Sequence, residues 1–173
     1  MANSPQIPSP PASASGFQYA LRILIGGVIV WIVLDHVNHH NPLWAIISVI
    51  TVTEPEIGPA LLAFYSRIVN TLIGCAVGLF FLYFLGPAIW WILIGIAVSI
   101  IICTHLIRVP VSWRIAPITV AIVMTPSVLI ASRAAGLPTA IERTEEVLLG
   151  SAVALLVTYC FSFVQRRLRS KPD

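Results

Sequence analysis

Two arginine-bearing segments, far apart in the chain, hold the residues best suited to bind a ligand. In the first segment, four residues fall at helical spacing and share one helix face: Arg67, Asn70, Gly74 and Gly78. A guanidinium and an amide are costly to expose to lipid, so this face is expected to meet protein or water. A guanidinium also presents a planar fork of hydrogen-bond donors, which suits a carboxylate.

The second segment aligns with the first without a gap, residues 142–154 with residues 66–78. The matched pairs are Arg67 with Arg143, Asn70 with Glu146, Gly74 with Gly150, and Gly78 with Ala154. This shared frame predicts an internal repeat whose small residues let another backbone approach closely. The alternative is that the arginines mark helix ends near the membrane surface, and that Arg143 simply pairs with Glu146 three residues on.

The composition is typical of a helical protein embedded in a membrane. Only 10% of the 173 residues are charged, against about 25% in an ordinary soluble domain, and 58% are hydrophobic. The net charge of +3 does not indicate nucleic-acid binding, because the basic residues cluster at predicted helix ends. The cysteines at 75, 103 and 160 lie inside apolar segments, so they predict neither a metal site nor a disulfide framework.

The chain is expected to form one membrane domain between two short tails. Residues 1–16 lack the positive start of a signal peptide and are predicted to be a disordered cytoplasmic tail. Residues 169–173 are predicted to be a basic cytoplasmic tail. Six helices are expected between the tails, at about residues 17–34, 43–53, 60–85, 88–105, 115–123 and 140–167.

The second and fifth helices are predicted to be short and to end at prolines. The second reaches Glu54-Pro55-Glu56 and then Pro59, and the fifth reaches Thr125-Pro126. Non-helical backbone at membrane depth must be buried in protein or line a water-filled cavity, so the two breaks are expected to meet near such a cavity. The alternative is that both are ordinary loops at the membrane surface.

The start of the last helix carries its own signal. Thr139 followed by Glu142 predicts a capping box, in which each side chain bonds the backbone of the other residue. The same assignment places the acidic residues 142, 145 and 146 near the positive end of the helix dipole.

These assignments predict two inverted repeats, at about residues 17–87 and 88–168, because three crossings per repeat reverse the second copy. Lys and Arg divide eight against two between the two sides, with residues 133 and 143 as the minority. That bias predicts that both termini are cytoplasmic, with Arg67 on the inner side and Arg143 on the outer. Arg22 is expected to snorkel toward the surface.

Other chemistry receives little support. Asp35, His36, His39 and His40 are a metal-ligand combination, although a polar loop with a chance histidine cluster is the preferred interpretation. The sequence contains no nucleophile–base pair and no phosphate loop, so neither an enzyme nor a cofactor is predicted.

Three features resemble a known family: the short helix ending in Glu54-Pro55, the helix with Arg67, Thr71, Gly74 and Gly78, and the last helix with Glu142-Arg143. Together they resemble the integral-membrane module of the fusaric acid resistance-like (FUSC) and aromatic acid exporter families, over about residues 17–165. The resemblance implies a six-helix module in a bacterial-type plasma (inner) membrane. It also implies efflux of aromatic carboxylic acids driven by the proton gradient.

Two functions are therefore weighed. The first is secondary efflux of a small aromatic or organic acid, along a path lined by Glu54, Pro55, Glu56, Arg67, Asn70, Thr125, Pro126, Arg143 and Glu146. Within it, a glutamate would carry a coupling proton, and Trp44, Phe64 and Tyr65 would form an aromatic wall. The second is a non-transporting subunit or scaffold for another membrane protein. In both cases a homo-oligomer is expected, with close-packing faces at Gly74, Gly78, Gly150 and Ala154.

Overall fold

The computed structural model describes residues 13–36, 42–106 and 113–169. Within these ranges every element of secondary structure is a helix, which confirms the predicted class. The elements are α1 (Ser13–His36), α2 (Leu43–Val52), α3 (Ile57–Leu85), α4 (Ile89–Ile101), the π-helix Ile102–Leu106, α5 (Ile115–Leu129), the 3-10 turn Arg133–Ala135 and α6 (Gly136–Arg169).

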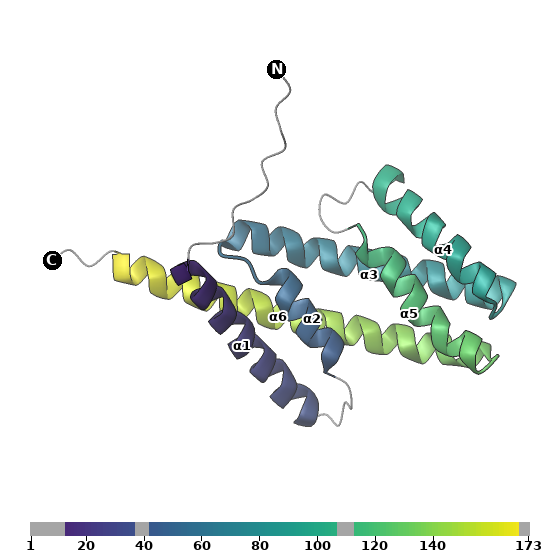
Figure 1. The fold of residues 1–173 in the computed structure, drawn as a ribbon, viewed down its shortest axis with the longest axis horizontal. Coiled ribbons are helices and arrows are strands. Elements are labelled where there is room, and N and C mark those ends of the chain that lie inside the picture. Colours follow the sequence, from purple (N-terminus) through teal and green to yellow (C-terminus); the bar gives the residue numbers. More distant parts are fainter. Residues whose placement is uncertain (1–12, 37–41, 107–112, 170–173) are drawn as a thin grey trace, which may run out of the picture.

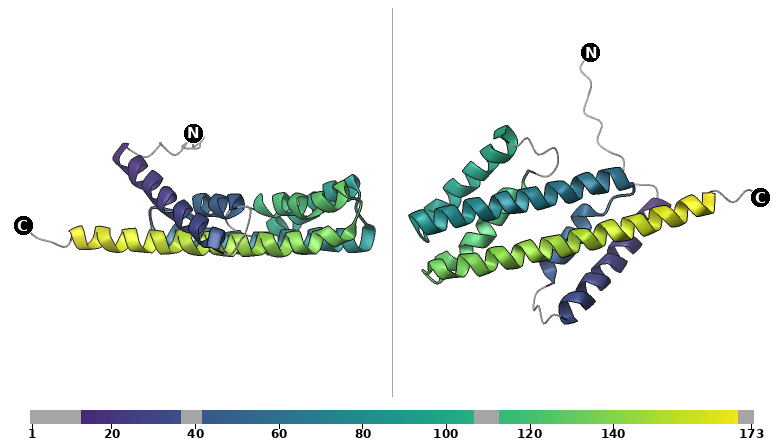
Figure 2. Two further views of the ribbon diagram at one scale, coloured as in Figure 1. Left: turned by 90° about the horizontal axis from the view of Figure 1, so that it is seen from below. Right: turned by 180° about the vertical axis from the view of Figure 1, so that it is seen from behind.

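The helices form two layers. The long helices α3 and α6 lie side by side and antiparallel (Figure 1), and the four shorter helices all lie on one side of this pair (Figure 2). With 29 and 34 residues, α3 and α6 are about 43 and about 51 Å long, which exceeds a hydrocarbon core of about 30 Å. In contrast, the 10 residues of α2 reach only about 15 Å and cannot cross a membrane.

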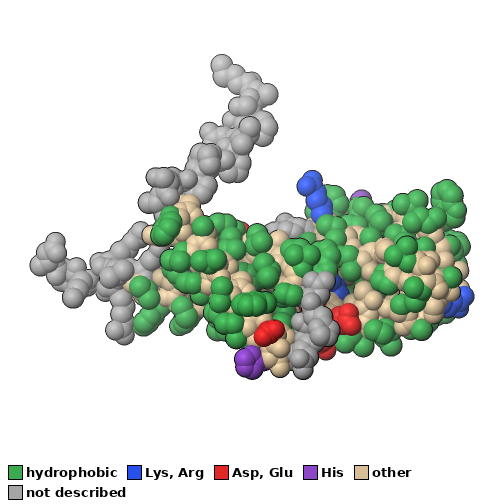
Figure 3. Space-filling view, turned by 60° about the horizontal axis from the view of Figure 1, so that its bottom comes forward, with side chains coloured by type: hydrophobic (Ala, Val, Ile, Leu, Met, Phe, Trp, Pro, Cys, Tyr) green, Lys and Arg blue, Asp and Glu red, His purple; other side chains and the backbone are tan. Residues whose placement is uncertain are grey.

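The surface and the helix lengths both suit a lipid environment. Three stretches are long and apolar enough to cross a membrane: Gly16–His36, Ile57–Leu85 and Arg133–Val164. Three shorter helices, Leu43–Val52, Ile89–His105 and Ile115–Leu129, are also apolar. Large side chains such as Trp31 and Phe84 are 57% and 75% exposed, and Figure 3 shows a surface that is mostly hydrophobic. By helix length and hydropathy, this is a multi-pass membrane protein.

Helix α3 begins earlier than the sequence predicted, because Pro59 lies within its first turn. The helix starts at Ile57, and the Ala60 amide donates to the Glu56 carbonyl at 3.2 Å. First-turn amides have no partner inside a helix, so a proline there removes nothing that the helix uses. The predicted start at residue 60 is therefore wrong, and the break before α3 spans only residues 53–56.

The predicted break at Thr125-Pro126 is also wrong, because α5 continues through both residues to Leu129. Pro126 removes the helical hydrogen bond that its own amide would donate, but its carbonyl still accepts from the Ile130 amide at 3.1 Å. In an apolar environment, ending the helix would leave several backbone groups without partners, whereas one proline leaves a single carbonyl. The helix ends one turn later, where Ala131 is left-handed (φ 50°) and the Ser132 amide bonds the Ser127 carbonyl.

Helix α6 begins at Gly136, which is earlier than the predicted start at about residue 140. Ser132 caps the 3-10 turn by accepting from the Ala134 amide at 3.3 Å, and α6 follows directly from Gly136. Thr139 thus lies inside the helix and donates to the Ala135 carbonyl at 2.8 Å, so the predicted capping box with Glu142 does not form. The first turn of α6 contains no acidic residue, and the expected pairing of the glutamates with the helix dipole is wrong.

Two glycines allow backbones to touch between the layers. A Cβ atom added at Gly74 in α3 would stand 2.5 Å from the Ala116 carbonyl oxygen of α5. A Cβ atom added at Gly150 in α6 would overlap the Ala45 carbonyl of α2. Both carbonyls belong to rigid helical backbone, so neither can yield without moving a whole helix.

We therefore predict that Gly150→Ala lowers the free energy of unfolding by about 1–3 kcal/mol, as expected for overpacking of a tight contact. Gly27→Ala is the matched control, because nothing lies within 4 Å of a Cβ atom at Gly27. Thermal unfolding in mild detergent, followed by circular dichroism, measures the difference. Equal midpoints for the two variants would show that α2 and α6 are not in backbone contact.

Candidate functional site

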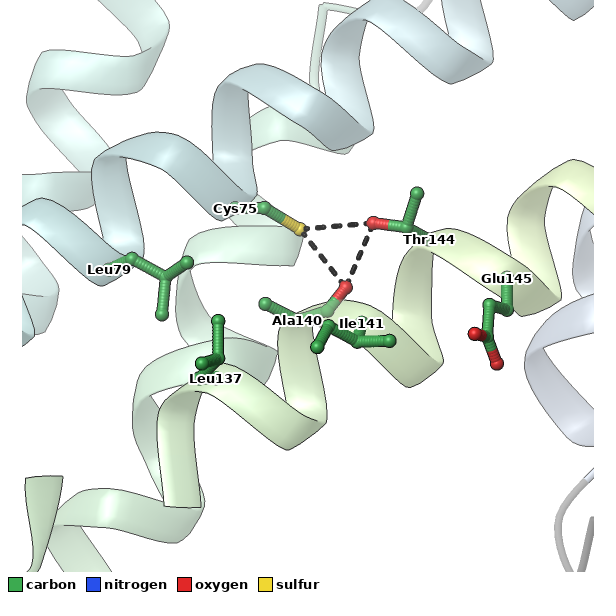
Figure 4. Close-up of a pocket in the computed structure, with 7 residues that line it drawn as sticks. All are labelled: Cys75, Leu79, Leu137, Ala140, Ile141, Thr144 and Glu145. Carbon is green, nitrogen blue, oxygen red and sulfur yellow. Dashed lines mark hydrogen bonds between the residues drawn. The ribbon is translucent and has the colours of Figure 1, made fainter. Parts of the chain in front are cut away.

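The candidate site lies where α3 and α6 cross. Their register is fixed by Cys75, whose thiol contacts the Ala140 carbonyl at 3.7 Å and the Thr144 hydroxyl at 3.9 Å (Figure 4). In an antiparallel pair, stepping back from Cys75 on α3 corresponds to stepping forward on α6. Asn70 therefore comes level with Glu146, and each carries its arginine one turn before it in its own helix.

Arg67 is held at this crossing by a short helix of the second layer. The side chain is only 4% exposed, and its Nη2 donates to the Ser48 hydroxyl at 3.3 Å. That hydroxyl in turn donates to the Trp44 carbonyl at 3.0 Å. The Nε of Arg67 has no hydrogen-bond acceptor among the described residues, so this side chain retains an unused donor inside the protein.

Arg143 reaches the same region from α6. It is 2% exposed, and its guanidinium carbon lies 4.1 Å from the centroid of the Trp44 ring. Its closest carboxylate is Glu146, with 4.0 Å between Nη1 and Oε2, the outer limit of an ion pair. Its Nε and Nη1 have no hydrogen-bond acceptor in the described part of the chain. Trp44 therefore orients the guanidinium without occupying its donors.

The charges at the crossing do not balance. Arg67 and Arg143 carry like charges at one crossing, and in the described part of the chain Glu146 is the carboxylate at ion-pair distance from Arg143. Two positive groups and one negative group leave a net charge of +1 within the buried crossing. A buried charge without a counter-ion is costly, so an anion entering here would be stabilised.

Four of the nine predicted pathway residues thus come together: Arg67, Asn70, Arg143 and Glu146. Asn70 is fully buried and donates to the Ser66 hydroxyl at 3.1 Å. The prediction that the two arginines lie on opposite sides of the membrane is wrong, because both are buried at one crossing. The interpretation of these arginines as surface anchors is wrong for the same reason.

The other five predicted residues lie elsewhere. Glu54, Pro55 and Glu56 belong to the connection from α2 to α3, whereas Thr125 and Pro126 belong to α5. The connection lies beside the C-terminal half of α6, and α5 lies toward the opposite end of the molecule (Figure 1). Thr125 is exposed, and its hydroxyl donates to the Ala121 carbonyl at 2.6 Å. The prolines predicted that these two segments meet at a shared cavity, and this prediction is wrong.

Of the expected aromatic wall, only Trp44 lies beside the arginines. Tyr65 is 62% exposed on the outer side of α3, and Phe64 packs against the core formed by α1, α2 and α6. Ser48 was missed by the sequence analysis. The available signal was its four-residue spacing from Trp44, which places both residues on one helix face. Without the register of α2 against α3 and α6, that signal could not show that Ser48 contacts Arg67.

Arg22 corrects another prediction, because it is buried rather than snorkelling. It crosses from α1 to the α2–α3 connection, where Nη1 donates to the carbonyls of Glu54 at 2.9 Å and Pro55 at 3.2 Å. Its guanidinium carbon also lies 5.1 Å from the centroid of the Phe161 ring in α6. Arg22 therefore supplies the donors that the broken backbone lacks.

A groove lies between α3 and α6 beside the crossing (Figure 4). Its volume is about 380 Å³. It is lined mainly by apolar side chains, with the Cys75 thiol and Thr144 hydroxyl at its base and Glu145 at its edge: Cys75, Leu79, Leu137, Ala140, Ile141, Thr144 and Glu145. The groove has the size of a small organic molecule.

The histidine cluster falls partly outside the described residues, which include Asp35 and His36 but not His39 or His40. Within residues 13–36, 42–106 and 113–169, no group of three or more His, Cys, Asp or Glu side chains is placed to hold a metal.

The fold and site define a helical multi-pass membrane protein with a buried centre of net positive charge. In comparison with protein families, residues 28–157, or 130 of the 173, match the family described as fusaric acid resistance protein-like. The chain belongs to this family, which confirms the resemblance drawn from its motifs. No curated protein and no solved structure matched the chain in the corresponding comparisons.

We predict that Arg22→Met lowers the free energy of unfolding by about 1–3 kcal/mol, because two backbone carbonyls lose a charged donor. Amide hydrogen exchange over residues 53–60 should also speed up. Arg114→Met is the matched control, since Arg114 is exposed and contacts only the ring of Trp113 in the described part of the chain. Unchanged exchange in Arg22→Met would mean that Arg22 does not hold this connection.

Proposed function

We propose that this protein is a secondary transporter that exports small organic anions, with aromatic carboxylic acids as the substrate class. The observation that carries the proposal is the unbalanced charge at the α3–α6 crossing. Arg67 and Arg143 are both almost fully buried, and among the described residues Glu146 is the carboxylate that comes within ion-pair distance of Arg143. The description of the family as fusaric acid resistance protein-like supports this direction of transport, because export is one route to resistance.

The proposed binding mode uses donors that the protein itself leaves unused. The substrate carboxylate accepts from Arg143 Nε and Arg67 Nε, neither of which has an acceptor within the described chain. The guanidinium of Arg143, which lies over the Trp44 ring, supplies the planar fork of donors that suits a carboxylate. Asn70 and Glu146 complete the proposed site. The adjoining apolar groove suits the ring of an aromatic acid.

We further propose that the chain consists of two inverted repeats, residues 17–87 and 88–168, flanked by the two tails. Matching contacts support the division. Gly74 on α3 faces the backbone of Ala116 and the side chain of Thr119, and Gly150 on α6 faces the backbone of Ala45 and the side chain of Ser48. The aligned glycines of the two sequence segments therefore have corresponding neighbours in α5 and α2.

We propose that both termini are cytoplasmic in a bacterial-type inner membrane. The start of α1 and the end of α6 lie toward the same end of the molecule (Figure 1). With the buried Arg22, Arg67 and Arg143 left out, residues 165–173 after α6's apolar span carry four basic residues, whereas Arg133 is the basic residue of the connection from α5 to α6 at residues 130–135. If a reporter that works only on the outer side of the membrane is active when fused to the C-terminus, this orientation is wrong.

We predict that cells producing the wild-type protein retain less labelled p-hydroxybenzoate than control cells, and that Arg67→Gln loses this effect. Loss of a charge-assisted hydrogen bond costs about 1.5–3 kcal/mol, so substrate binding should weaken by about 10- to 150-fold. Arg143→Gln should act in the same direction. Because Arg67 and Arg143 repel each other, Arg67→Gln removes a repulsion from the fold. Retention is compared at matched membrane levels.

Arg114→Gln is the control for this experiment, since it removes an exposed arginine by the same substitution. Its efflux should equal that of the wild type. Equal retention in all cells would reject this substrate class and favour the alternative, a non-transporting subunit of another membrane protein. Efflux that survives Arg67→Gln and Arg143→Gln would instead move the anion path away from the crossing.

We also propose a homo-oligomer, but not through the predicted glycine faces. Gly74, Gly78 and Gly150 contact α5 or α2 within the same chain, and Ala154 belongs to the core beneath α1 and α2. The remaining surface is the side of α3 and α6 that no other described helix covers (Figure 2). Chemical crosslinking in native membranes should therefore yield dimers or larger assemblies. Only monomers, both in bilayers and in mild detergent, would contradict the proposal.

A further inference from the structure

Most of the apolar core of the described chain falls into two groups of helices, and a smaller cluster of Cys75, Val123 and Ala140 lies between them. One cluster unites α1, α2 and the second half of α6, and consists of Val30, Leu34, Ala45, Val49, Val52, Val153, Ala154 and Val157. Another unites α3, α4 and α5, and consists of Val77, Phe81, Ile92, Val120 and Met124. We name these groups the α6 unit and the α3 unit. Each long helix thus packs with the two short helices from the other half of the sequence.

Close glycine contacts reinforce both units from within. In the α6 unit, Gly26 meets Val49 and Val153, and Gly150 meets the Ala45 backbone. In the α3 unit, Gly74 meets Ala116, Gly78 meets Val123, and Gly95 meets Val120 and Phe81. Gly136, at the very start of α6, is the glycine that contacts the other unit, through Leu82. Interlocked contacts of this kind resist sliding, so each unit is expected to move as one body.

The seam between the units is built differently. Along the α3–α6 crossing it contains Arg67, Asn70, Arg143 and Glu146, two of which carry like charges. Buried polar atoms of Arg67, Thr71 and Arg143 have no hydrogen-bond partner in the described chain, and the 380 Å³ groove opens along the same seam. Across the seam Arg67 donates to Ser48, and Cys75 packs against Ala140. Separating two surfaces costs less where buried polar atoms lack partners than where apolar side chains interlock throughout.

The described chain passes between the units at two non-helical connections. Residues 53–56 lead from α2 into α3, and residues 130–135 lead from α5 through a 3-10 turn into α6. Each connection is held by an arginine: Arg22 bonds the Glu54 and Pro55 carbonyls, and Arg133 donates to the Tyr83 carbonyl at 2.8 Å. Short connections between rigid bodies are where hinge motions concentrate their backbone changes.

We propose that the α6 unit and the α3 unit are the moving parts of the transporter, which slide or rock against each other along the α3–α6 seam. The inference rests on the proposed function, because it concerns how the arginine centre opens first to one side of the membrane and then to the other. The moving bodies are therefore not the two halves of the sequence. Each is assembled from two helices of one half and the long helix of the other.

Three neighbouring side chains allow a matched test. Cys75 of α3, Val123 of α5 and Ala140 of α6 share one packed cluster. In a Cys103→Ser/Cys160→Ser background, Ala140→Cys pairs the native Cys75 with a thiol across the seam. Val123→Cys pairs the same Cys75 with a thiol inside the α3 unit. Membranes are oxidised, disulfide formation is counted by maleimide gel shift, and p-hydroxybenzoate efflux is measured before and after reduction.

Both disulfides alter the groove at Cys75, but only the crosslink to residue 140 ties the two units together, so it is expected to lower efflux at least tenfold more than the crosslink to residue 123, with recovery on reduction. Full efflux with Cys75 quantitatively linked to residue 140 would overturn the inference, and so would an equal loss of efflux on linking residue 123. Thr144→Cys is a second cross-seam variant, because its hydroxyl lies 3.9 Å from the Cys75 thiol. If neither cross-seam disulfide forms, the seam does not close as described and the inference also fails. Absence of efflux from the reduced background protein would instead reject the proposed function.

Discussion

The structure depends on keeping two guanidinium groups out of lipid. Neither Arg67 nor Arg143 can be exposed to hydrocarbon without a large cost, and neither has a full set of partners. The antiparallel crossing of α3 and α6 buries both, and α2 covers them with Ser48 and Trp44. Because α2 has only to cover this centre and not to cross the membrane, its 10 residues are long enough for the task.

Residue type and spacing were sufficient to predict the helical membrane class of the fold. The aligned Arg–Gly segments identified the two helices that cross, and the residues on their polar stripe are the ones that the crossing buries. What the sequence could not supply was the pairing of helices. The inverted repeat and the Lys/Arg bias predicted Arg67 and Arg143 on opposite sides of the membrane, whereas the register set by Cys75 brings them together.

Proline was a poor guide to breaks for a physical reason. Pro59 lies in a first turn, where a missing amide costs nothing, and Pro126 removes a single bond from a helix that is otherwise complete. Pro55 does mark a break, but its free carbonyl is bonded by Arg22 from another helix, a contact no local pattern contains. Similarly, the capping box at Thr139 matched a local motif while the actual start of α6, at Gly136 behind Ser132, was decided by the turn from α5.

The crossed assembly of the long helices also bears on biosynthesis. Helices α1 and α2 emerge from the ribosome well before α6, the helix that completes their apolar core. At about 5–20 residues per second, the roughly 80 residues between the end of α2 and the start of α6 take about 4–16 s to make. During that interval the N-terminal helices have lipid or insertion machinery as their neighbours, and Arg67 enters the bilayer before α6 can pack against it. The N-terminal half is thus committed to the membrane before it can be folded.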